Sequence, residues 1–298
     1  MRKNIWRHIG LMVAVAGLAV GCGTSASHPT TAAGTNPSRA KPSMIIPTPA
    51  ATLDASAPEP NGTFWVLAGP PTTRGIYEID VARRKVLGSV SVSNSAVAIA
   101  ESSTGVVAVG LATPTTGAVE FCNGSTGALL NTVPVGGPVV SIAAGDDGTS
   151  FYVLNGTTTA KTVTIVDSQT DKIVGNIPAP ADAVSVVPAP NETSVYVLEP
   201  NGVVSQIATT GGHILAQFPI GHSGRSLAIG PDGHTLYVLK GQGATRNVAV
   251  VNLATESVHT VLPAPANAEA IVLSPDGQIL YDVVGTPTVG NVQAYTLS

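Results

Sequence analysis

Four basic side chains in the last third of the chain have the types and the spacing to bind an anion. They are His222 and Arg225 in one short segment, and Lys240 and Arg246 in the next. Arginine and lysine donate several hydrogen bonds each to carboxylate or phosphate oxygens. Only 14 lysines and arginines occur in a chain of net charge −4, so several of them on one surface would concentrate anionic ligands there. We predict an anion-binding rim, for a glycan acid, a phosphate-bearing wall polymer or an acidic partner loop; scattered solubilising charge is the alternative.

The other side chains with catalytic potential form no recognisable set. Of the six histidines, His8 lies in the leader and His28 in the linker after it, and the other four fall at different positions of the repeat described below, so they are not expected to converge on a metal. Many acids lie in turn-like segments, where Asp side chains cap backbone N–H groups; they include Asp80, Asp167, Asp232 and Asp276. The sequence contains neither a Gly-x-Ser-x-Gly motif nor a Walker phosphate loop. We predict no catalytic residues, no metal site and no cofactor, and the net charge gives no reason to expect nucleic-acid binding.

Cys122 is the one cysteine besides Cys22. In our alignment of the repeats it takes the turn position held elsewhere by Asp80, Asp167 and Asn252. A reactive thiolate needs a cationic neighbour or a helix N-terminus, and the surrounding sequence offers neither. We interpret Cys122 as a drifted repeat position rather than a redox site.

The first 21 residues predict a secretory signal peptide. Arg2, Lys3 and Arg7 precede an apolar run of 13 residues, Ile9 to Gly21, which is shorter than the ~20 residues that span a bilayer. A charged start, a short apolar centre and small residues at the end are typical of export signals.

The end of this leader predicts lipid attachment at Cys22. The segment Leu18-Ala-Val-Gly-Cys22 resembles a bacterial lipobox, although Ala19 stands where leucine is usual. Residues 22–43 are rich in Ser, Thr, Pro, Ala and Gly, a composition typical of disordered tethers. We predict a lipid-anchored protein on the extracytoplasmic face of the cell membrane; an ordinary signal peptide or a transmembrane anchor are the alternatives.

Four copies of a short apolar strand recur along the rest of the chain. They begin at Phe151, Val195, Leu236 and Leu280, which are 44, 41 and 44 residues apart. Periods of this length belong to propeller blades or helical arrays. The repeats are β-branched and interrupted by Gly and Pro, so we predict an all-β propeller with very little helix.

The ends of the chain predict how the ring closes. Five full four-strand units start at Phe64, and the chain then stops after two strands. The segment starting at Ile46-Pro-Thr-Pro aligns with that starting at Ile177-Pro-Ala-Pro and can supply the missing strands. We predict a six-bladed β-propeller over residues 44–298, closed by N- and C-terminal strands that share the last blade, because closure removes open sheet edges. Pro42 limits the donated strand, and five or an imperfect seven blades are the alternatives.

These repeats resemble the YVTN family of β-propeller repeats of exported and cell-surface proteins. The resemblance covers nearly all of 64–298 and rests on Tyr152-Val-Leu-Asn, Tyr237-Val-Leu-Lys, Ile165-Val-Asp-Ser-Gln-Thr, Val250-Val-Asn-Leu-Ala-Thr, Ile229-Gly-Pro-Asp-Gly and Val272-Leu-Ser-Pro-Asp-Gly. It implies a propeller used for binding or scaffolding, without a common catalytic set.

Together these features predict a membrane-anchored binding module of the cell envelope, whose partner is a protein or an envelope polymer. A lactonase- or hydrolase-like propeller enzyme is the first alternative, and bound metal would favour it. A structural surface-layer component is the second, and self-assembly would favour it. The sequence names neither the ligand nor the oligomeric state.

Overall fold

The computed structural model describes residues 42–48, 52–56, 62–70, 72–285 and 290–297. The predicted signal peptide, Cys22 and nearly all of the predicted tether lie outside these residues. Within the unit Asn36–Ser298, the described residues form 24 β-strands and one short 3-10 helix, η1 (Gly243–Thr245). No helix in this part of the chain is long and apolar enough to cross a membrane. The prediction of an all-β chain with very little helix is confirmed.

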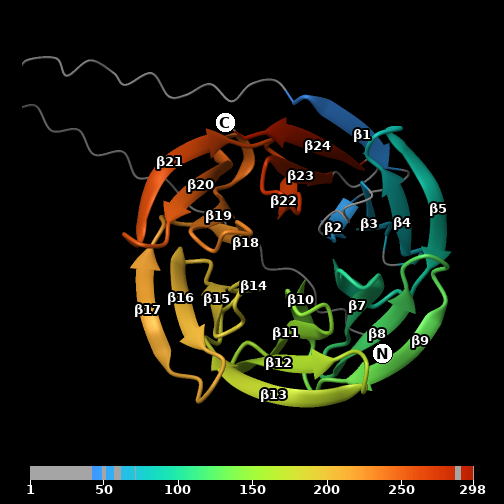
Figure 1. Ribbon diagram of the computed structural model, residues 1–298, viewed down its shortest axis with the longest axis horizontal. Helices are drawn as coiled ribbons and strands as arrows, with labels where there is room; N and C mark the ends of the chain where they lie inside the picture. The colour runs from blue at the N-terminus through green and yellow to red at the C-terminus, as the bar shows by residue number, and fades with distance from the viewer. Residues whose placement is uncertain (1–41, 49–51, 57–61, 71, 286–289, 298) are drawn as a thin grey trace, which may run out of the picture. The chain divides into compact units, whose positions relative to one another are not determined.

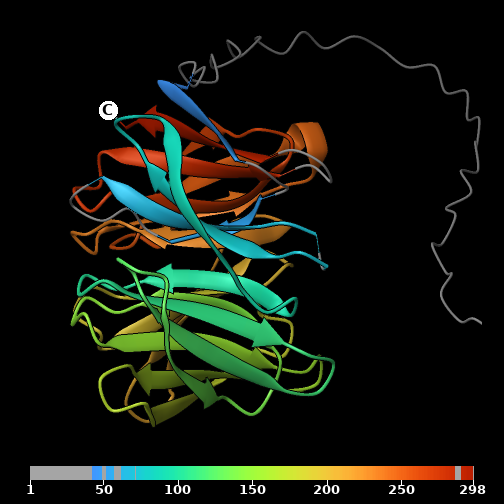
Figure 2. The same cartoon turned by 90° about the vertical axis from the view of Figure 1, so that its right-hand side faces the viewer.

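The strands form six antiparallel four-stranded sheets, arranged as the blades of a ring (Figure 1). Blades 1 to 3 are β2 (Thr52–Ala55), β3 (Thr63–Ala68), β4 (Gly75–Asp80) and β5 (Lys85–Ser91); β6 (Ala96–Glu101), β7 (Val106–Ala112), β8 (Gly117–Asn123) and β9 (Leu129–Pro134); and β10 (Val139–Ala144), β11 (Ser150–Gly156), β12 (Lys161–Asp167) and β13 (Lys172–Ala179). Blades 4 to 6 are β14 (Ser185–Pro188), β15 (Ser194–Leu198), β16 (Val203–Ala208) and β17 (Ile214–Pro219); β18 (Gly224–Ile229), β19 (Thr235–Lys240), β20 (Asn247–Asn252) and β21 (Ser257–Pro263); and β22 (Ala268–Leu273), β23 (Ile279–Gly285), β24 (Gly290–Thr296) and β1 (Met44–Thr48). In blades 1 to 5 the chain starts at the centre of the ring and ends at its outer wall, and the edge-on view shows how strongly the sheets twist (Figure 2).

The ring closes through blade 6, which both ends of the chain build. Strand β1 pairs antiparallel with β24, with Ile46 opposite Val292, and Ile46 is 1% exposed. The next N-terminal strand, β2, becomes the inner strand of blade 1. The predicted shared blade is therefore confirmed. Its N-terminal strand, β1, starts at Met44, two residues after Pro42.

The core lies between neighbouring blades, where large side chains from adjacent sheets pack against one another. Phe121 of blade 2 and Phe151 of blade 3 have ring centroids 5.3 Å apart. Phe64 of blade 1 and Tyr281 of blade 6 lie 5.6 Å apart, so the same kind of contact crosses the closure. Because each blade buries its faces against its neighbours, every blade depends on the complete ring.

The position of Cys122 corrects our alignment of the second repeat. Asn123, and not Cys122, takes the turn position: its Oδ1 accepts hydrogen bonds from the N–H groups of Ser125 (3.0 Å) and Thr126 (2.9 Å). Asp167 Oδ1 binds two N–H groups in the same way. Cys122 pairs with Val107 inside the sheet and is 4% exposed. A slip of one residue moves a side chain from one face of a strand to the other, so the interpretation of Cys122 as a turn position was wrong.

Candidate functional site in the central channel

The six inner strands surround a cavity of about 440 Å³ at the centre of the ring. Its wall consists of these strands and the turns that follow them, and most of it is aliphatic. The charged side chains in this wall are Asp54, Glu101 and Asp146; no lysine, arginine or histidine lines it in the described part of the chain. A cavity of this size with apolar walls and a few polar groups suits an organic ligand.

A belt of hydrogen bonds joins the inner strands around this cavity. One repeat position in blades 3, 4 and 5 carries a serine whose Oγ accepts a backbone N–H of the next inner strand. The donors are Val186 N to Ser141 at 3.4 Å, Leu227 N to Ser185 at 3.1 Å and Ile271 N to Ser226 at 3.2 Å. The pairing of the inner strands shifts just before Ser141 and Ser226, and such bulges re-aim a side chain. The belt therefore ties each of these blades to the next.

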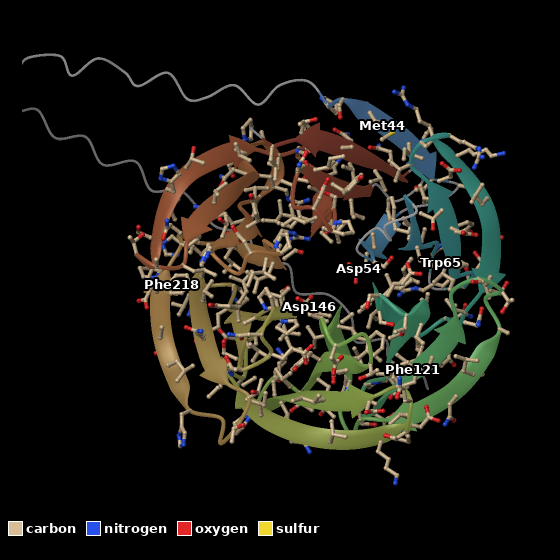
Figure 3. All side chains as sticks on the ribbon, in the orientation of Figure 1. Met44, Asp54, Trp65, Phe121, Asp146 and Phe218 are labelled. Atoms are coloured by element: carbon tan, nitrogen blue, oxygen red, sulfur yellow. The ribbon has the colours of Figure 1, made fainter. Side chains whose placement is uncertain are left out.

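Asp54 takes the belt position in blade 1. Its Oδ2 accepts the N–H of Ile99 in blade 2 at 3.0 Å, and its Oδ1 accepts the N–H of Ala55 at 3.0 Å. The side chain is half-buried at the edge of the cavity and lies at the centre of the ring in Figure 3. Burial raises the pKa of Asp54 to about 7, and the two backbone hydrogen bonds only partly oppose this shift. Asp54 is thus a carboxyl group that titrates near neutrality beside an apolar cavity, as many functional carboxyl groups do.

Two further acids make the cavity electrostatically negative. Glu101 Oε2 accepts a hydrogen bond from Ser56 Oγ at 3.2 Å. Asp146, in the turn after β10, lines the cavity and lies near the central opening in Figure 3, and burial, with Asp147 nearby, raises its pKa. Acids of one sign in a narrow apolar space favour a cationic ligand.

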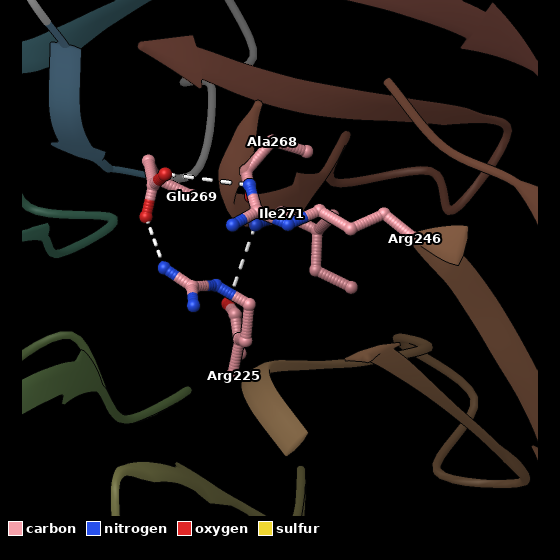
Figure 4. A network of polar contacts seen from close by, with 6 residues as sticks. Arg225, Arg246, Ala268, Glu269 and Ile271 are labelled. Atoms are coloured by element: carbon pink, nitrogen blue, oxygen red, sulfur yellow. Dashed lines mark hydrogen bonds and ion pairs between the residues drawn. The ribbon is translucent and has the colours of Figure 1, made fainter. Parts of the chain in front are cut away.

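Two residues of the predicted anion-binding rim meet on a carboxylate that we did not single out in the sequence. Arg225 of β18 forms an ion pair with Glu269 of β22, and Arg246 Nη1 lies 3.3 Å from the other oxygen of Glu269 (Figure 4). Arg246 also donates to the carbonyl of Ala268, and its side chain is 9% exposed. The two guanidinium charges are therefore partly neutralised within the protein.

The contact between Arg246 and Ala268 repeats elsewhere in the ring. Lys161 Nζ donates to the carbonyl of Ala183 at 2.8 Å, and both pairs are 22 residues apart. Each basic residue also stands five positions after a glycine of positive φ, Gly156 or Gly241. This shared spacing is visible in the sequence and indicates that Arg246, like Lys161, connects two neighbouring blades.

The other two rim residues lie beside Gly221. His222 is exposed, with Nδ1 3.2 Å from the carbonyl oxygen of Asn201. Lys240 Nζ is 2.7 Å from where a Cβ on Gly221 would be, and it has no acidic partner among the described residues. Anion binding by His222, Arg225, Lys240 and Arg246 stays a prediction, and it now depends mainly on Lys240.

Comparison with known proteins supports the fold only. The chain superposes on Kuenenia stuttgartiensis hydrazine synthase with a TM-score of 0.64 at 15% identity, covering 83% of this chain and 84% of that one. It superposes on the Cps50 (Swd1) β-propeller domain of Myceliophteria thermophila with a TM-score of 0.63 at 10% identity, covering 87% of this chain and 99% of that one. No protein-family model and no curated protein matches the sequence. At such identities the likeness carries no activity to this chain.

Proposed function

We propose that this protein is a ligand-binding propeller of the cell envelope that takes its ligand into the central channel. The observation that carries the proposal is the closed ring around an apolar cavity of about 440 Å³, with the carboxyl group of Asp54 at its edge. Ligand sites are commonly concave, mostly apolar and supplied with few polar groups. A six-bladed ring holds such a site rigid, because every wall strand is paired within a sheet.

The polar contacts around the channel favour binding over catalysis. The hydrogen-bond partners of Asp54 among the described residues are backbone N–H groups, so this carboxylate is not paired there with a hydroxyl or thiol nucleophile. Ser56 donates to Glu101, but its Oγ also accepts the N–H of Trp65 at 2.9 Å, and the residue is 1% exposed. A nucleophile must be accessible and paired with a base, and these two groups do not meet that requirement.

The proposed location rests on the sequence. Lipid chains on Cys22 would hold the protein to the membrane, since burial of each CH₂ contributes about 0.8 kcal/mol. Residues 22–43 would form the tether, and β1 starts at Met44, directly after it. The YVTN-like repeats fit the same proposal, because that family is met in exported and cell-surface proteins.

A ligand screen that also follows the chemical fate of each compound tests the binding function. The full chain is incubated with small organic cations, anions and neutral compounds, its Tm is measured, and each compound is then analysed by mass spectrometry. We expect a subset to raise the Tm and to be recovered unchanged. Conversion of any compound would establish an enzyme instead, and no Tm increase with any compound would contradict the proposal.

The location is tested by labelling cells with a radioactive fatty acid. We expect the wild-type chain and Cys122→Ala to carry label and sediment with membranes, whereas Cys22→Ala carries none. Equal labelling of Cys22→Ala would exclude the anchor while leaving the channel proposal intact.

A further inference from the structure

We propose that the channel binds an organic ammonium ion with an apolar stem, and that Asp54 is its counter-ion. This inference rests on the proposed binding function and names the ligand class. Three independent features of the channel carry it: a charge that the fold does not need, a wall without positive groups in its described part, and aliphatic side chains in the same wall.

The charge of Asp54 exceeds what the belt of hydrogen bonds requires. Ser141, Ser185 and Ser226 accept the same inter-blade N–H with a neutral hydroxyl. In blades 2 and 6 the corresponding residues are Ala98 and Ala270, which follow the same shift of strand pairing and provide no acceptor at all. A carboxylate at this position is costly to desolvate, so its presence indicates a role outside the fold.

The sign of the ligand follows from the surroundings of Asp54. Asp54 makes no ion pair with any described residue, and the other charged groups of the cavity wall, Glu101 and Asp146, are also acidic. Each oxygen of Asp54 accepts one backbone N–H and retains a second lone pair for an ammonium donor. No group of three or more metal-binding side chains occurs in the described part of the chain, so the side chains favour an organic cation over a metal ion.

The apolar stem has a matching surface in the same cavity. Ile229 and Val272 are partly exposed and line the wall together with Ala143 and Ala144. Burying one methylene against such side chains strengthens binding roughly fourfold. Affinity should therefore rise along a series of alkylamines until the cavity is full.

Isothermal titration calorimetry of the full chain at pH 8 tests the proposal with n-hexylamine, 1-hexanol and hexanoate. These probes share one stem and differ in charge. We expect n-hexylamine to bind at least tenfold more tightly than 1-hexanol, and hexanoate to bind most weakly. Asp54→Asn keeps an acceptor for the belt but loses the charge, so it should lose tenfold or more in amine affinity with 1-hexanol unchanged. Asp54→Ser introduces the residue that blades 3 to 5 have at this position and should also lose tenfold or more in amine affinity. It keeps the test decisive if Asp54→Asn fails to fold.

A control variant separates the counter-ion from the general field of the protein. Asp171→Asn removes the same charge from the turn between β12 and β13, outside the cavity wall, and should leave all three affinities unchanged. Equal affinities for amine and alcohol, or an unchanged amine affinity in Asp54→Asn, would overturn the inference. In those cases the binding function would still stand if other compounds bind, whereas failure of every compound would overturn both.

The pH dependence gives a second readout. The pKa of Asp54 is raised to about 7, while an alkylamine stays protonated up to about pH 10. Amine affinity should be constant between pH 8 and 9 and fall about tenfold per unit well below pH 7, and this dependence should be absent in Asp54→Asn. A lysine peptide with blocked ends, titrated in parallel, distinguishes the two sources of an ammonium group. Tighter binding of the peptide than of the free amine would point to a protein partner.

Discussion

Asp54 illustrates how a single residue can oppose stability while serving a site. Its folded-state pKa of about 7 lies above the usual 3.8, so the folded protein holds the proton more tightly than the unfolded chain does. The stabilisation from this proton is complete below about pH 4 and is lost as the pH rises to 7. In blades 3 to 5 a serine makes the same inter-blade hydrogen bond without a charge. The charge of Asp54 therefore fits the common trade-off between stability and function.

Asp54→Asn should therefore stabilise the protein, and more so at higher pH. A shift of about three units at 1.36 kcal/mol per unit limits the gain to ~4 kcal/mol, and we expect on the order of 2 kcal/mol at pH 8 because the side chain borders the cavity. At pH 4 the variant should gain nothing. Urea unfolding at both pH values checks this, and a gain independent of pH would show that the Asp54 charge is not buried as described.

Cys122 should be inert in the folded protein. Burial, with a smaller effect of Glu120, raises its pKa to about 11, so about one thiol in a thousand is ionised at pH 8, and the thiolate is the reactive form. In a Cys22→Ala background, alkylation of Cys122 by iodoacetamide should be slow until the chain is denatured. Rapid alkylation of the native protein would contradict the buried position.

At the scale of the element, the side-chain contacts between blades are the feature that the repeat pattern did not predict. The period of the apolar strands predicted the blades, and the alignment of the segment at Ile46 with the segment at Ile177 predicted six of them and the shared closing blade. These features depend only on the order and spacing of the strands. The pairing of Arg225 and Arg246 with Glu269 depends on contacts between blades, and the exact register of each strand decides it. The same limit explains Cys122, where one residue of misalignment exchanged a turn for the core, and Asp54, which lies before the first clear repeat and was not identified.

Arg246 and Lys161 should contribute similarly to stability if both are ties between blades. Replacing either by Met removes the donor to a main-chain carbonyl of the next blade, Ala268 or Ala183. An unsatisfied buried acceptor costs about 1–3 kcal/mol, and we expect losses in this range in urea unfolding. As a control, Lys172→Met at the exposed start of β13 should change stability by less than about 0.5 kcal/mol, as surface substitutions do. An Arg246→Met variant as stable as Lys172→Met would show that Arg246 does not connect the two blades.

The whole molecule is stabilised by closure rather than by any one blade. Each sheet is too small to fold alone, and its faces are buried only when both neighbours are present. Strand β1 at the start of the ring is thus as important for blade 6 as the three C-terminal strands of that blade. Ile46 shows this dependence, because it packs in one cluster with Phe64 of blade 1 and Tyr281 of blade 6.

Truncation before and after β1 tests closure directly. A chain that starts at residue 42 keeps β1 and should melt at the same temperature as the protein with its tether. A chain that starts at residue 49 loses the five-residue strand β1, which exposes the edge of β24 and removes Ile46 from the core. Loss of the buried Ile46 side chain alone costs roughly 2–5 kcal/mol, and each kcal/mol lowers the Tm of a domain of this size by about 2–4 °C. With the pairing of β1 lost as well, we expect the Tm to fall by about 10 °C or more, with aggregation through the open edge. Equal melting of the two truncated chains would show that the ring does not depend on the strand that joins its ends.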